Sequence, residues 1–335
     1  MKPSPRVIKQ PLRVIVCTPD LTQTQQWAAE LHQQSQALAL PLEVLLSSAD
    51  GQVQGTRLPL DDAPADYAIG WKPEAKFFAA HPQIKAFFNA GAGVDYFLNN
   101  PEVTALIPPA LPIIRLEDAG MAQQMIDYCR HQVLDWMYSS SIYQEQQQRQ
   151  VWIEQAAPRR ADFPIGVFGL GVLGAALAQS FARDGFPVLG HARRHKLIEG
   201  VHFEPQLESF LAKTKILILL APATAQTRHV MHEASFALLP RGAYLINVAR
   251  GALVHEPSLL KALDGGHLKA ACLDVFEQEP LPAANPLWRH PRIRITPHSS
   301  AATHIDEAAK QILKKIIALQ AGENVSGKVD LDRGY

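Results

Sequence analysis

Three residues in the C-terminal half of the chain have types that could together perform acid–base chemistry. Arg250, Glu279 and His298 each come shortly after an apolar run with the composition of a buried β-strand. Strands of a parallel sheet end at a common edge, and open α/β sheets bind their ligands at that edge. We therefore expect the three side chains to meet in one crevice.

A cation, a proton donor and a carboxylate are the groups that hydride reduction of a 2-keto acid requires. Arg250 would bind the substrate carboxylate and the developing alkoxide, and His298 would give a proton to the ketone oxygen. Glu279 would stabilise the protonated imidazole, because a carboxylate favours the charged form of a neighbouring ring. Glu277 is a rival acid, and the residue types alone do not separate it from Glu279.

A glycine-rich loop follows the apolar run 165–168 and opens a helix that is expected to end near Arg183. Its sequence is Gly169-Leu170-Gly171-Val172-Leu173-Gly174. In such a loop the first glycine permits a tight turn, the second lets the backbone approach a pyrophosphate, and the third allows close helix–strand packing. The amides at the helix N-terminus would then bind the phosphates. A glycine-rich turn without a ligand is the alternative interpretation.

The segment after the next strand indicates which dinucleotide binds. An NAD enzyme usually places Asp or Glu about 20 residues beyond the glycine loop, where it binds the ribose 2′-hydroxyl. Here the strand 188–190 is followed by a basic turn with Arg193 and Arg194, and the first acid is Glu199. Because a planar guanidinium suits a phosphate, we expect NADP, with NADPH preferred over NADH; a solvated basic turn is the alternative. Asp274 is expected to accept from the nicotinamide carboxamide, or else to be a turn or cap residue.

Two series of alternating strands and helices would position these residues. The alternation predicts two doubly wound, Rossmann-like or flavodoxin-like domains with parallel sheets. In the first series the expected strands are 12–17, 42–46, 67–70, 86–88 and 113–116, with a helix over 22–37. In the second they are 165–168, 188–190, 215–220, 243–248, 270–276 and 293–296.

Two helical segments lie outside this alternation. Residues 121–150 contain neither proline nor glycine and have an apolar stripe, so they are expected to form a long helical stretch. Residues 305–319 are expected to form an amphipathic helix near the end of the chain.

The chain resembles the D-isomer-specific 2-hydroxyacid dehydrogenase family over nearly its whole length, and most closely its glyoxylate/hydroxypyruvate reductase A branch. Besides the glycine loop, the segments that carry the resemblance are Asn89–Asp95, Arg115–Met121, Ala249–Gly251, Leu273–Pro280, Pro286–Trp288, Thr296–His298 and Asp332–Tyr335.

The resemblance assigns further roles. The acid that precedes proline, Glu279, becomes the catalytic one, together with Arg250 and His298. Backbone amides around Ala92 and Gly93 would hold the substrate carboxylate. The neighbouring Trp71 and Lys72 would cover the substrate, and Ala249 would contact the cofactor. Many relatives have Asp-Glu where this chain has His255-Glu256, a position expected to start a helix.

The resemblance also implies a domain order. The dinucleotide domain would be inserted into the substrate domain, so that residues 1–117 and 301–335 form the substrate domain and residues 118–300 the NADP-binding Rossmann domain. Relatives are usually dimers joined through the dinucleotide domain, and the stretch 121–150 is the candidate interface for a homodimer.

Composition excludes several classes of function. The 335 residues include 32 basic and 32 acidic ones, so no net field would attract nucleic acid or an anionic membrane. Cys17, Cys129 and Cys272 are scattered, which predicts buried thiols in a reducing compartment and no metal cluster. The N-terminal residues 1–10 have no apolar signal core, and no apolar run reaches the ~20 residues of a membrane helix. These features predict a cytoplasmic protein.

The expected function is therefore NADPH-dependent reduction of glyoxylate and hydroxypyruvate to glycolate and D-glycerate. An NAD(P)-sensing regulator on the same fold is one alternative, although such a protein should have lost a catalytic residue. A dehydrogenase for formate, phosphite or a larger D-2-hydroxy acid is another, but formate enzymes of this family have Gln at the position of Glu279. A binding module without chemistry is the third, and it would leave the glycine loop, the basic turn and the triad as coincidences.

Overall fold

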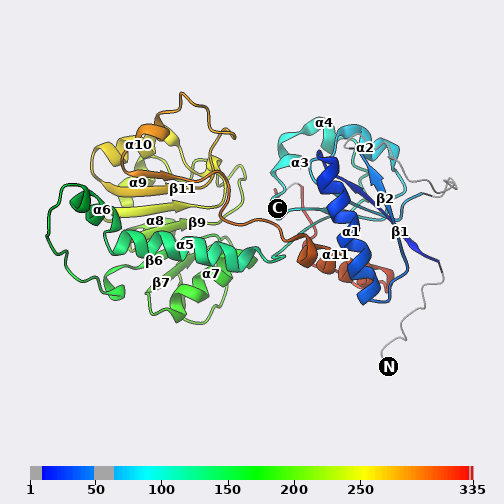
Figure 1. Cartoon of the computed structure of the whole chain (residues 1–335), viewed down its shortest axis with the longest axis horizontal. Coiled ribbons are helices and arrows are strands. Elements are labelled where there is room, and N and C mark those ends of the chain that lie inside the picture. The colour runs from blue at the N-terminus through cyan, green and yellow to red at the C-terminus, as the bar shows by residue number, and fades with distance from the viewer. Residues whose placement is uncertain (1–9, 49–63, 332, 335) are drawn as a thin grey trace. The chain divides into compact units, whose positions relative to one another are not determined.

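The computed structural model describes residues 10–48, 64–331, 333 and 334. Residues 1–9, Asp332 and Tyr335, about which the sequence made predictions, lie outside the described residues. The chain forms two compact units, residues 1–120 with 303–335 and residues 121–302 (Figure 1). One unit is thus inserted into the other along the chain.

A five-stranded parallel sheet forms the centre of the first unit, in the order β2-β1-β3-β4-β5. This order is that of flavodoxin-like doubly wound folds. The strands are β1 (Leu12–Cys17), β2 (Leu42–Ser47), β3 (Tyr67–Gly70), β4 (Phe87–Asn89) and β5 (Ile113–Arg115). All five strands were predicted from the sequence, with ends shifted by one residue in β2, β4 and β5.

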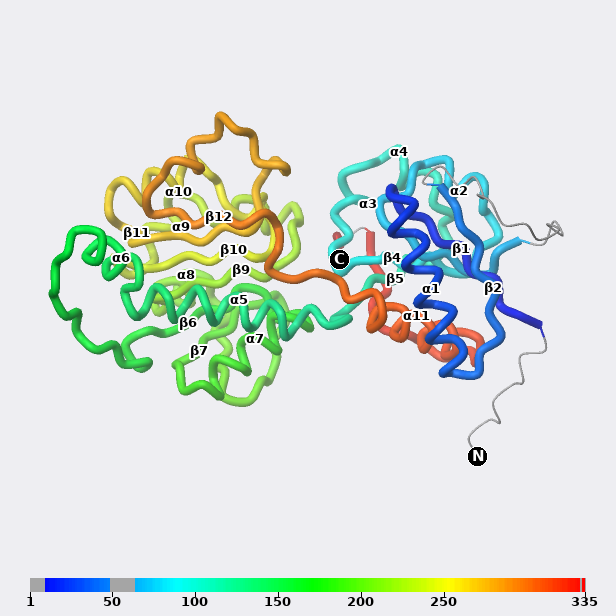
Figure 2. The backbone as a smooth tube through the Cα atoms, in the orientation of Figure 1, coloured from blue at the N-terminus to red at the C-terminus, as the bar shows by residue number. Residues whose placement is uncertain are grey.

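Among the described residues of this unit, two long helices and three short ones surround the sheet. The helices are α1 (Leu21–Ala37), α2 (Ala75–Ala80), α3 (Asp95–Asn99), α4 (Pro101–Thr104) and α11 (Ile305–Gln320). Helix α1 packs against α11, although the two come from opposite ends of the chain (Figure 2). The α11 residues Ala308, Ile312 and Ile316 recur every four positions and are buried, which explains why this stretch is helical. A separate core in this unit contains Phe77, Phe87 and other aromatic residues.

The second unit contains a seven-stranded parallel sheet in the order β12-β11-β10-β9-β6-β7-β8. Its first six strands in sequence have the Rossmann order, and β12 extends the sheet at one edge. The strands are β6 (Ile165–Phe168), β7 (Val188–His191), β8 (Val201–Phe203), β9 (Ile216–Leu219), β10 (Ala243–Asn247), β11 (Leu268–Leu273) and β12 (Ile293–Ile295). Strand β8 was missed because it has only three residues, with a histidine in the middle, and carries no clear pattern.

Helices cover both faces of this sheet. They are α5 (Met121–Met137), α6 (Ser140–Gln148), α7 (Val172–Arg183), α8 (Leu207–Ala212), α9 (Glu233–Leu238) and α10 (Glu256–Asp264), with short 3₁₀ helices at Arg160–Asp162, Gly251–Leu253 and Pro286–Arg289. In β9, Ile216 and Ile218 belong to the core with α5 and α7. Leu217 and Leu219 belong to the core with α8, α9 and α10. Successive side chains of β9 thus point to opposite faces of the sheet and pack into two different cores. This confirms the doubly wound architecture.

The stretch 121–150 is not one helix, which corrects the prediction. Helix α5 ends at Met137, and Ser139 has a left-handed backbone with φ +57° before α6 begins. The buried stripe of α5 ends at Met137, whereas α6 has no buried residue. Helix α5 is therefore stabilised by packing on the sheet. The residues after Met137 have no such packing, so the helix ends there.

Two other predictions can be compared with the structure. Cys17, Cys129 and Cys272 are all buried and unpaired, as expected. Among the described residues, no helix is both long enough and apolar enough to cross a membrane.

Candidate active site

The three glycines of the loop after β6 differ in what surrounds them. A Cβ on Gly169, whose φ is +106°, would lie 2.5 Å from the backbone nitrogen of Ala221. A Cβ on Gly174 would overlap the carbonyl oxygen of Gly169. A Cβ on Gly171, the N-cap of α7, would meet nothing within 4 Å. The first and third glycines are therefore required by the chain's own packing, and the second leaves open space at a helix N-terminus, which fits a diphosphate.

The basic turn lies next to this loop. The backbone N–H of Gly169 donates to the carbonyl of His191, the last residue of β7, at 2.8 Å. The His191 ring stacks on Phe168 with centroids 5.4 Å apart. Arg193 and Arg194 come next after Ala192 and are exposed. The structure therefore brings the glycine loop and both predicted phosphate-binding arginines to neighbouring strand ends.

His298 and Glu279 form a hydrogen-bonded pair. Nδ1 of His298 lies 2.8 Å from Oε2 of Glu279, whose Oε1 accepts from the N–H of Phe276 at 2.9 Å. Partial burial raises the pKa of Glu279, but the hydrogen bonds from His298 and Phe276 and the charges of His298 and Arg250 outweigh this effect, so that its pKa is lowered. With Nδ1 engaged by a carboxylate, Nε2 is the ring nitrogen that can give a proton to a substrate.

Glu277 has other partners. Its carboxylate contacts Nε2 of His229 and lies 3.5 Å from Nη2 of Arg228. The His229 ring lies beside the ring of His255, with centroids 5.1 Å apart. The structure thus separates the two rival acids that residue types left open. It also contains a second His–Glu pair that the sequence did not indicate, because His229 and Glu277 are 48 residues apart.

Asp274 organises the loop that carries His298. It is fully buried, and its carboxylate accepts from Thr296 Oγ1 at 2.6 Å and from the N–H groups of Ser299 and Ser300 at 2.8 and 2.9 Å. Its carbonyl oxygen accepts from the N–H of His298, whose φ is +53°. This structural role was missed, since it depends on contacts across more than 20 residues. The predicted bond to a carboxamide stays a prediction.

Arg250 follows β10 in a loop that is shaped by Asn247. The buried Asn247 side chain donates to the carbonyl of Arg250 at 3.0 Å and accepts from the N–H of Ala249 at 3.1 Å. Nη1 of Arg250 donates to the carbonyl of Ala249 at 2.6 Å. A Cβ on Gly251 would overlap the backbone of Phe276, so the loop packs directly against the segment that leads to Glu279. Arg250 and Glu279 are therefore held on adjoining backbone.

His255, where the chain departs from many relatives, is the N-cap residue of α10. Its Nδ1 lies 2.7 Å from the hydroxyl oxygen of Ser258. The prediction that this position starts a helix is confirmed.

In the first unit, Ala92 and Gly93 lie in the loop after β4 and are partly exposed. Trp71 follows β3 and packs on this loop, since a Cβ on Gly91 would overlap its indole ring. Nζ of Lys72 lies 5.8 Å from the centroid of the Trp71 ring. Trp71 and Lys72 thus lie beside the loop that the sequence assigned to the substrate carboxylate.

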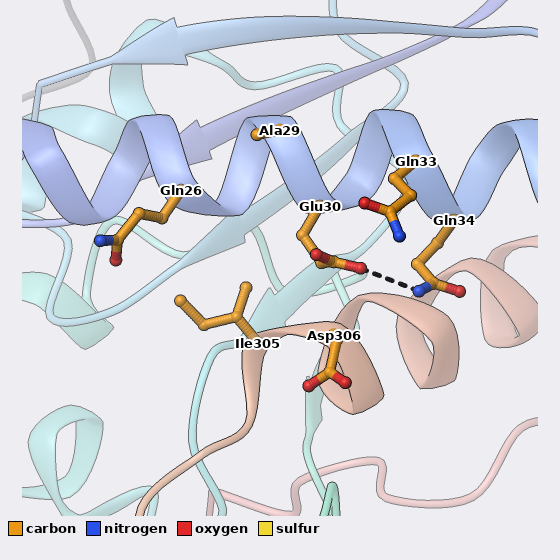
Figure 3. Close-up of a pocket in the computed structure, with 7 residues that line it drawn as sticks. All are labelled: Gln26, Ala29, Glu30, Gln33, Gln34, Ile305 and Asp306. Atoms are coloured by element: carbon orange, nitrogen blue, oxygen red, sulfur yellow. Dashed lines mark hydrogen bonds between the residues drawn. The ribbon is translucent and has the colours of Figure 1, made fainter.

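An open groove elsewhere in the first unit has a different lining (Figure 3). Its side chains come from α1 and from the start of α11: Gln26, Ala29, Glu30, Gln33, Gln34, Ile305 and Asp306. Glu30 accepts from Gln34 at 2.8 Å, as the dashed line indicates. The lining contains no cation, imidazole or thiol, and none of the predicted catalytic residues lies there.

Comparisons with known proteins identify relatives of this chain. Residues 131–300 match the profile of the NAD binding domain of D-isomer specific 2-hydroxyacid dehydrogenases. Glyoxylate/hydroxypyruvate reductase A from Salmonella paratyphi B is 43% identical over 282 residues, which cover 82% of this chain and 89% of the relative.

Two solved structures are similar over nearly the whole chain. A D-isomer specific 2-hydroxyacid dehydrogenase from Xanthobacter autotrophicus Py2, in complex with NADPH and MES, has a TM-score of 0.87 and 38% identity, covering 96% of this chain and 99% of its own. An NADPH-dependent glyoxylate/hydroxypyruvate reductase from Sinorhizobium meliloti, in complex with NADP and sulfate, has a TM-score of 0.82 and 30% identity, covering 97% of this chain and 100% of its own.

Proposed function

Because the chain belongs to the D-isomer specific 2-hydroxyacid dehydrogenase family, we propose that it uses NADPH to reduce small 2-keto acids. The substrates are glyoxylate and hydroxypyruvate, and the products are glycolate and D-glycerate. The observation that carries the proposal is the pair of His298 and Glu279, 2.8 Å apart, with the charge of Arg250 acting on the same carboxylate. These are the proton donor, its stabilising anion and the cation that the reaction requires.

The second unit is the NADP-binding domain in this proposal, and the first unit is the substrate domain. Gly169, Gly171 and Gly174, with the amides of Val172 and Leu173 at the start of α7, hold the diphosphate. Arg193 and Arg194 bind the 2′-phosphate, and Ala249 and Asp274 lie beside the nicotinamide. When bound, NADPH supplies the hydride. The open space at Gly171 and the NADPH and NADP in the two similar structures support this assignment.

The chain's own residues then bind the substrate and move the proton. The guanidinium of Arg250 and the N–H groups of Ala92 and Gly93 bind the carboxylate. His298 gives the proton on Nε2 to the ketone oxygen, and Glu279 stabilises the ring while it is charged. Trp71 and Lys72 cover the substrate from their place beside Gly91.

The rival functions can be compared by how well each accounts for the pairing of His298 with Glu279. A sensor of NADP would have no use for the pairing of His298 with Glu279. A formate dehydrogenase would have Gln in place of Glu279. An enzyme for a larger D-2-hydroxy acid would retain every residue named above, since one methylene changes specificity by only about 1–3 kcal/mol.

The test is the loss of NADPH absorbance with glyoxylate and with hydroxypyruvate, with NADH in parallel. We expect turnover with both acids, and faster turnover with NADPH than with NADH. Turnover only with a larger 2-keto acid would correct the substrate. Measurable NADPH binding without turnover of any 2-keto acid would favour the sensor.

We further propose that the protein is a homodimer joined through the second unit. Of the expected interface 121–150, the part that takes part is α6, together with residues 151–154 that follow it. Helix α6 has no buried residue, and the segment after it folds back on it, with the N–H of Gln155 donating to the Tyr143 hydroxyl at 3.0 Å. Trp152 is 92% exposed and Ile153 is 58% exposed, which is unusual for adjacent large apolar side chains. Light scattering should give twice the chain mass for the wild type and a monomer for Trp152→Glu, with Leu238→Glu on α9 as an exposed apolar control. A monomeric wild type would contradict the proposal.

A further inference from the structure

Asn89, the last residue of β4, directs its side chain back to the loop that follows it. It is only 2% exposed, and its Nδ2 donates to the carbonyl oxygens of Gly91 at 2.8 Å and Gly93 at 2.9 Å. Both hydrogens of one buried amide are therefore used within four residues of the chain. Such an arrangement determines the course of the loop more strictly than an apolar residue could.

The same loop leaves two N–H groups available. The carbonyl of Gly91 accepts a second hydrogen bond, from the N–H of Leu116 at 3.2 Å. In the part of the chain that the structure describes, the N–H groups of Ala92 and Gly93 donate to no other group, and both residues are partly exposed. Consecutive N–H groups without a partner form an anion-binding surface, provided that no carbonyl oxygen is turned to the same side.

We propose that Asn89 is the positioning residue of the carboxylate-binding loop. By holding the carbonyls of Gly91 and Gly93 on its own side, it leaves the N–H groups of Ala92 and Gly93 for the substrate. The inference rests on the proposed function, which assigns these amides to the carboxylate.

The second unit has a related arrangement before Arg250, in which a buried asparagine donates to one carbonyl and accepts from one N–H group. Asn247 ends β10, is fully buried, and donates to the carbonyl of Arg250 at 3.0 Å. A buried asparagine at a strand end thus shapes each of the two loops that are assigned to the carboxylate.

The residue type matters because both carbonyls need a donor. Alanine at position 89 would leave the carbonyl of Gly93 without this partner, while Gly91 would keep the bond from Leu116. Serine is shorter and has one hydroxyl hydrogen, so it could satisfy at most one carbonyl. The effect on the loop should therefore increase from serine to alanine.

The experiment compares Asn89→Ser and Asn89→Ala with wild type. A matched control is Asn100→Ala in the same unit, since Asn100 also donates from Nδ2 to a backbone carbonyl, that of Tyr96, at 2.6 Å. We measure KM and kcat for glyoxylate, the Kd of NADPH, and the calorimetric Kd of oxalate on the NADPH complex. Oxalate binds through carboxylates and undergoes no reduction.

We expect Asn89→Ala to raise KM and the oxalate Kd together by about tenfold, with a smaller change in kcat, because the loop binds the carboxylate before and during the reaction. Asn89→Ser should give a smaller rise of the same kind. The Kd of NADPH should stay at the wild-type value in both, and Asn100→Ala should change none of the four constants.

An unchanged oxalate Kd in either Asn89 variant would overturn the proposal, as would a loss of kcat at constant KM. If Asn89→Ala does not fold, the oxalate Kd of Asn89→Ser decides whether the proposal holds. Failure of the proposed function can be distinguished from failure of this inference. If the wild type reduced neither 2-keto acid, the oxalate Kd of wild type and variants would still show whether Asn89 positions the loop.

Discussion

The imidazole of His298 and the carboxylate of Glu279 are joined by a 2.8 Å hydrogen bond between Nδ1 and Oε2, across 19 residues of sequence. The other carboxylate oxygen of Glu279 is held by the N–H of Phe276. The backbone of His298 is held by the carbonyl of Asp274. Both partners are thus fixed by local contacts, and the pair is already assembled in the second unit by itself.

Replacement of His298 should affect chemistry rather than cofactor binding. For His298→Gln we expect kcat to fall about 10²–10⁴-fold, because glutamine cannot serve as a general acid, while the Kd of NADPH changes little. Steady-state kinetics and fluorescence titration measure the two quantities. His229→Gln is the matched control, since His229 also contacts a glutamate, and it should keep most of the activity. Wild-type turnover in His298→Gln would remove this residue from the mechanism.

The two glutamates should differ sharply. Glu279→Gln removes the negative charge beside His298, and we expect kcat to fall by about two orders of magnitude. Glu277→Gln should retain kcat within about threefold, because Glu277 contacts His229 and Arg228 instead. Parallel measurements of kcat and of the melting temperature test this difference. Equal losses of kcat in the two variants would speak against a special role for Glu279.

The basic turn should determine the cofactor preference. We expect Arg193→Ala to weaken NADPH about 10–100-fold and to leave NADH nearly unchanged, because the lost contact involves only the 2′-phosphate. Arg194→Ala should act in the same direction. Arg183→Ala, at the far end of α7 from the glycine loop, is the control and should change neither affinity. Equal weakening of both dinucleotides by Arg193→Ala would refute the phosphate role.

Two glycine substitutions should separate stability from binding. Gly174→Ala should lower the melting temperature, because the new Cβ overlaps the carbonyl of Gly169. Gly171→Ala should leave the melting temperature of the free protein nearly unchanged, since its Cβ meets nothing within 4 Å. It should nevertheless weaken NADPH strongly, because the Cβ occupies the space assigned to the diphosphate. Calorimetry and NADPH titration distinguish the two effects, and full NADPH affinity in Gly171→Ala would exclude that space as the binding site.

Glu204 should contribute a pH-dependent part of the stability. Hydrogen bonds from Lys213 and Ser209 lower the pKa of Glu204 to about 2. A carboxyl group has a pKa of about 4.3 in the unfolded chain, so the contribution is complete above that pH and is lost as the pH falls toward about 2. Glu204→Gln should therefore lower the melting temperature at neutral pH, and the difference from wild type should shrink as the pH falls below about 4. Glu208→Gln, at an exposed position, is the control and should leave the melting temperature nearly unchanged. A difference in melting temperature between Glu204→Gln and wild type that stays constant with pH would contradict the assignment.

Much of the fold and of the cofactor site was predictable from the sequence, because the relevant signals are local. The glycines at 169, 171 and 174 have their spacing within one strand–turn–helix unit, and the two arginines follow the very next strand. The apolar strands were recognisable one by one, and their alternation with helices implied parallel sheets. The break at Ser139 was not predictable, since it depends on where the buried face of α5 ends.

Contacts between distant segments were decided only by the tertiary structure. Glu277 and Glu279 are two residues apart and chemically alike, and only the folded chain pairs one with His229 and the other with His298. The hydrogen bonds that the Asp274 carboxylate accepts from the loop that carries His298 are likewise set only by the folded chain. A sequence specifies which side chains can act as acid, base or anion. Their pairing depends on which strand ends become neighbours, and that order is set by the packing of the whole sheet.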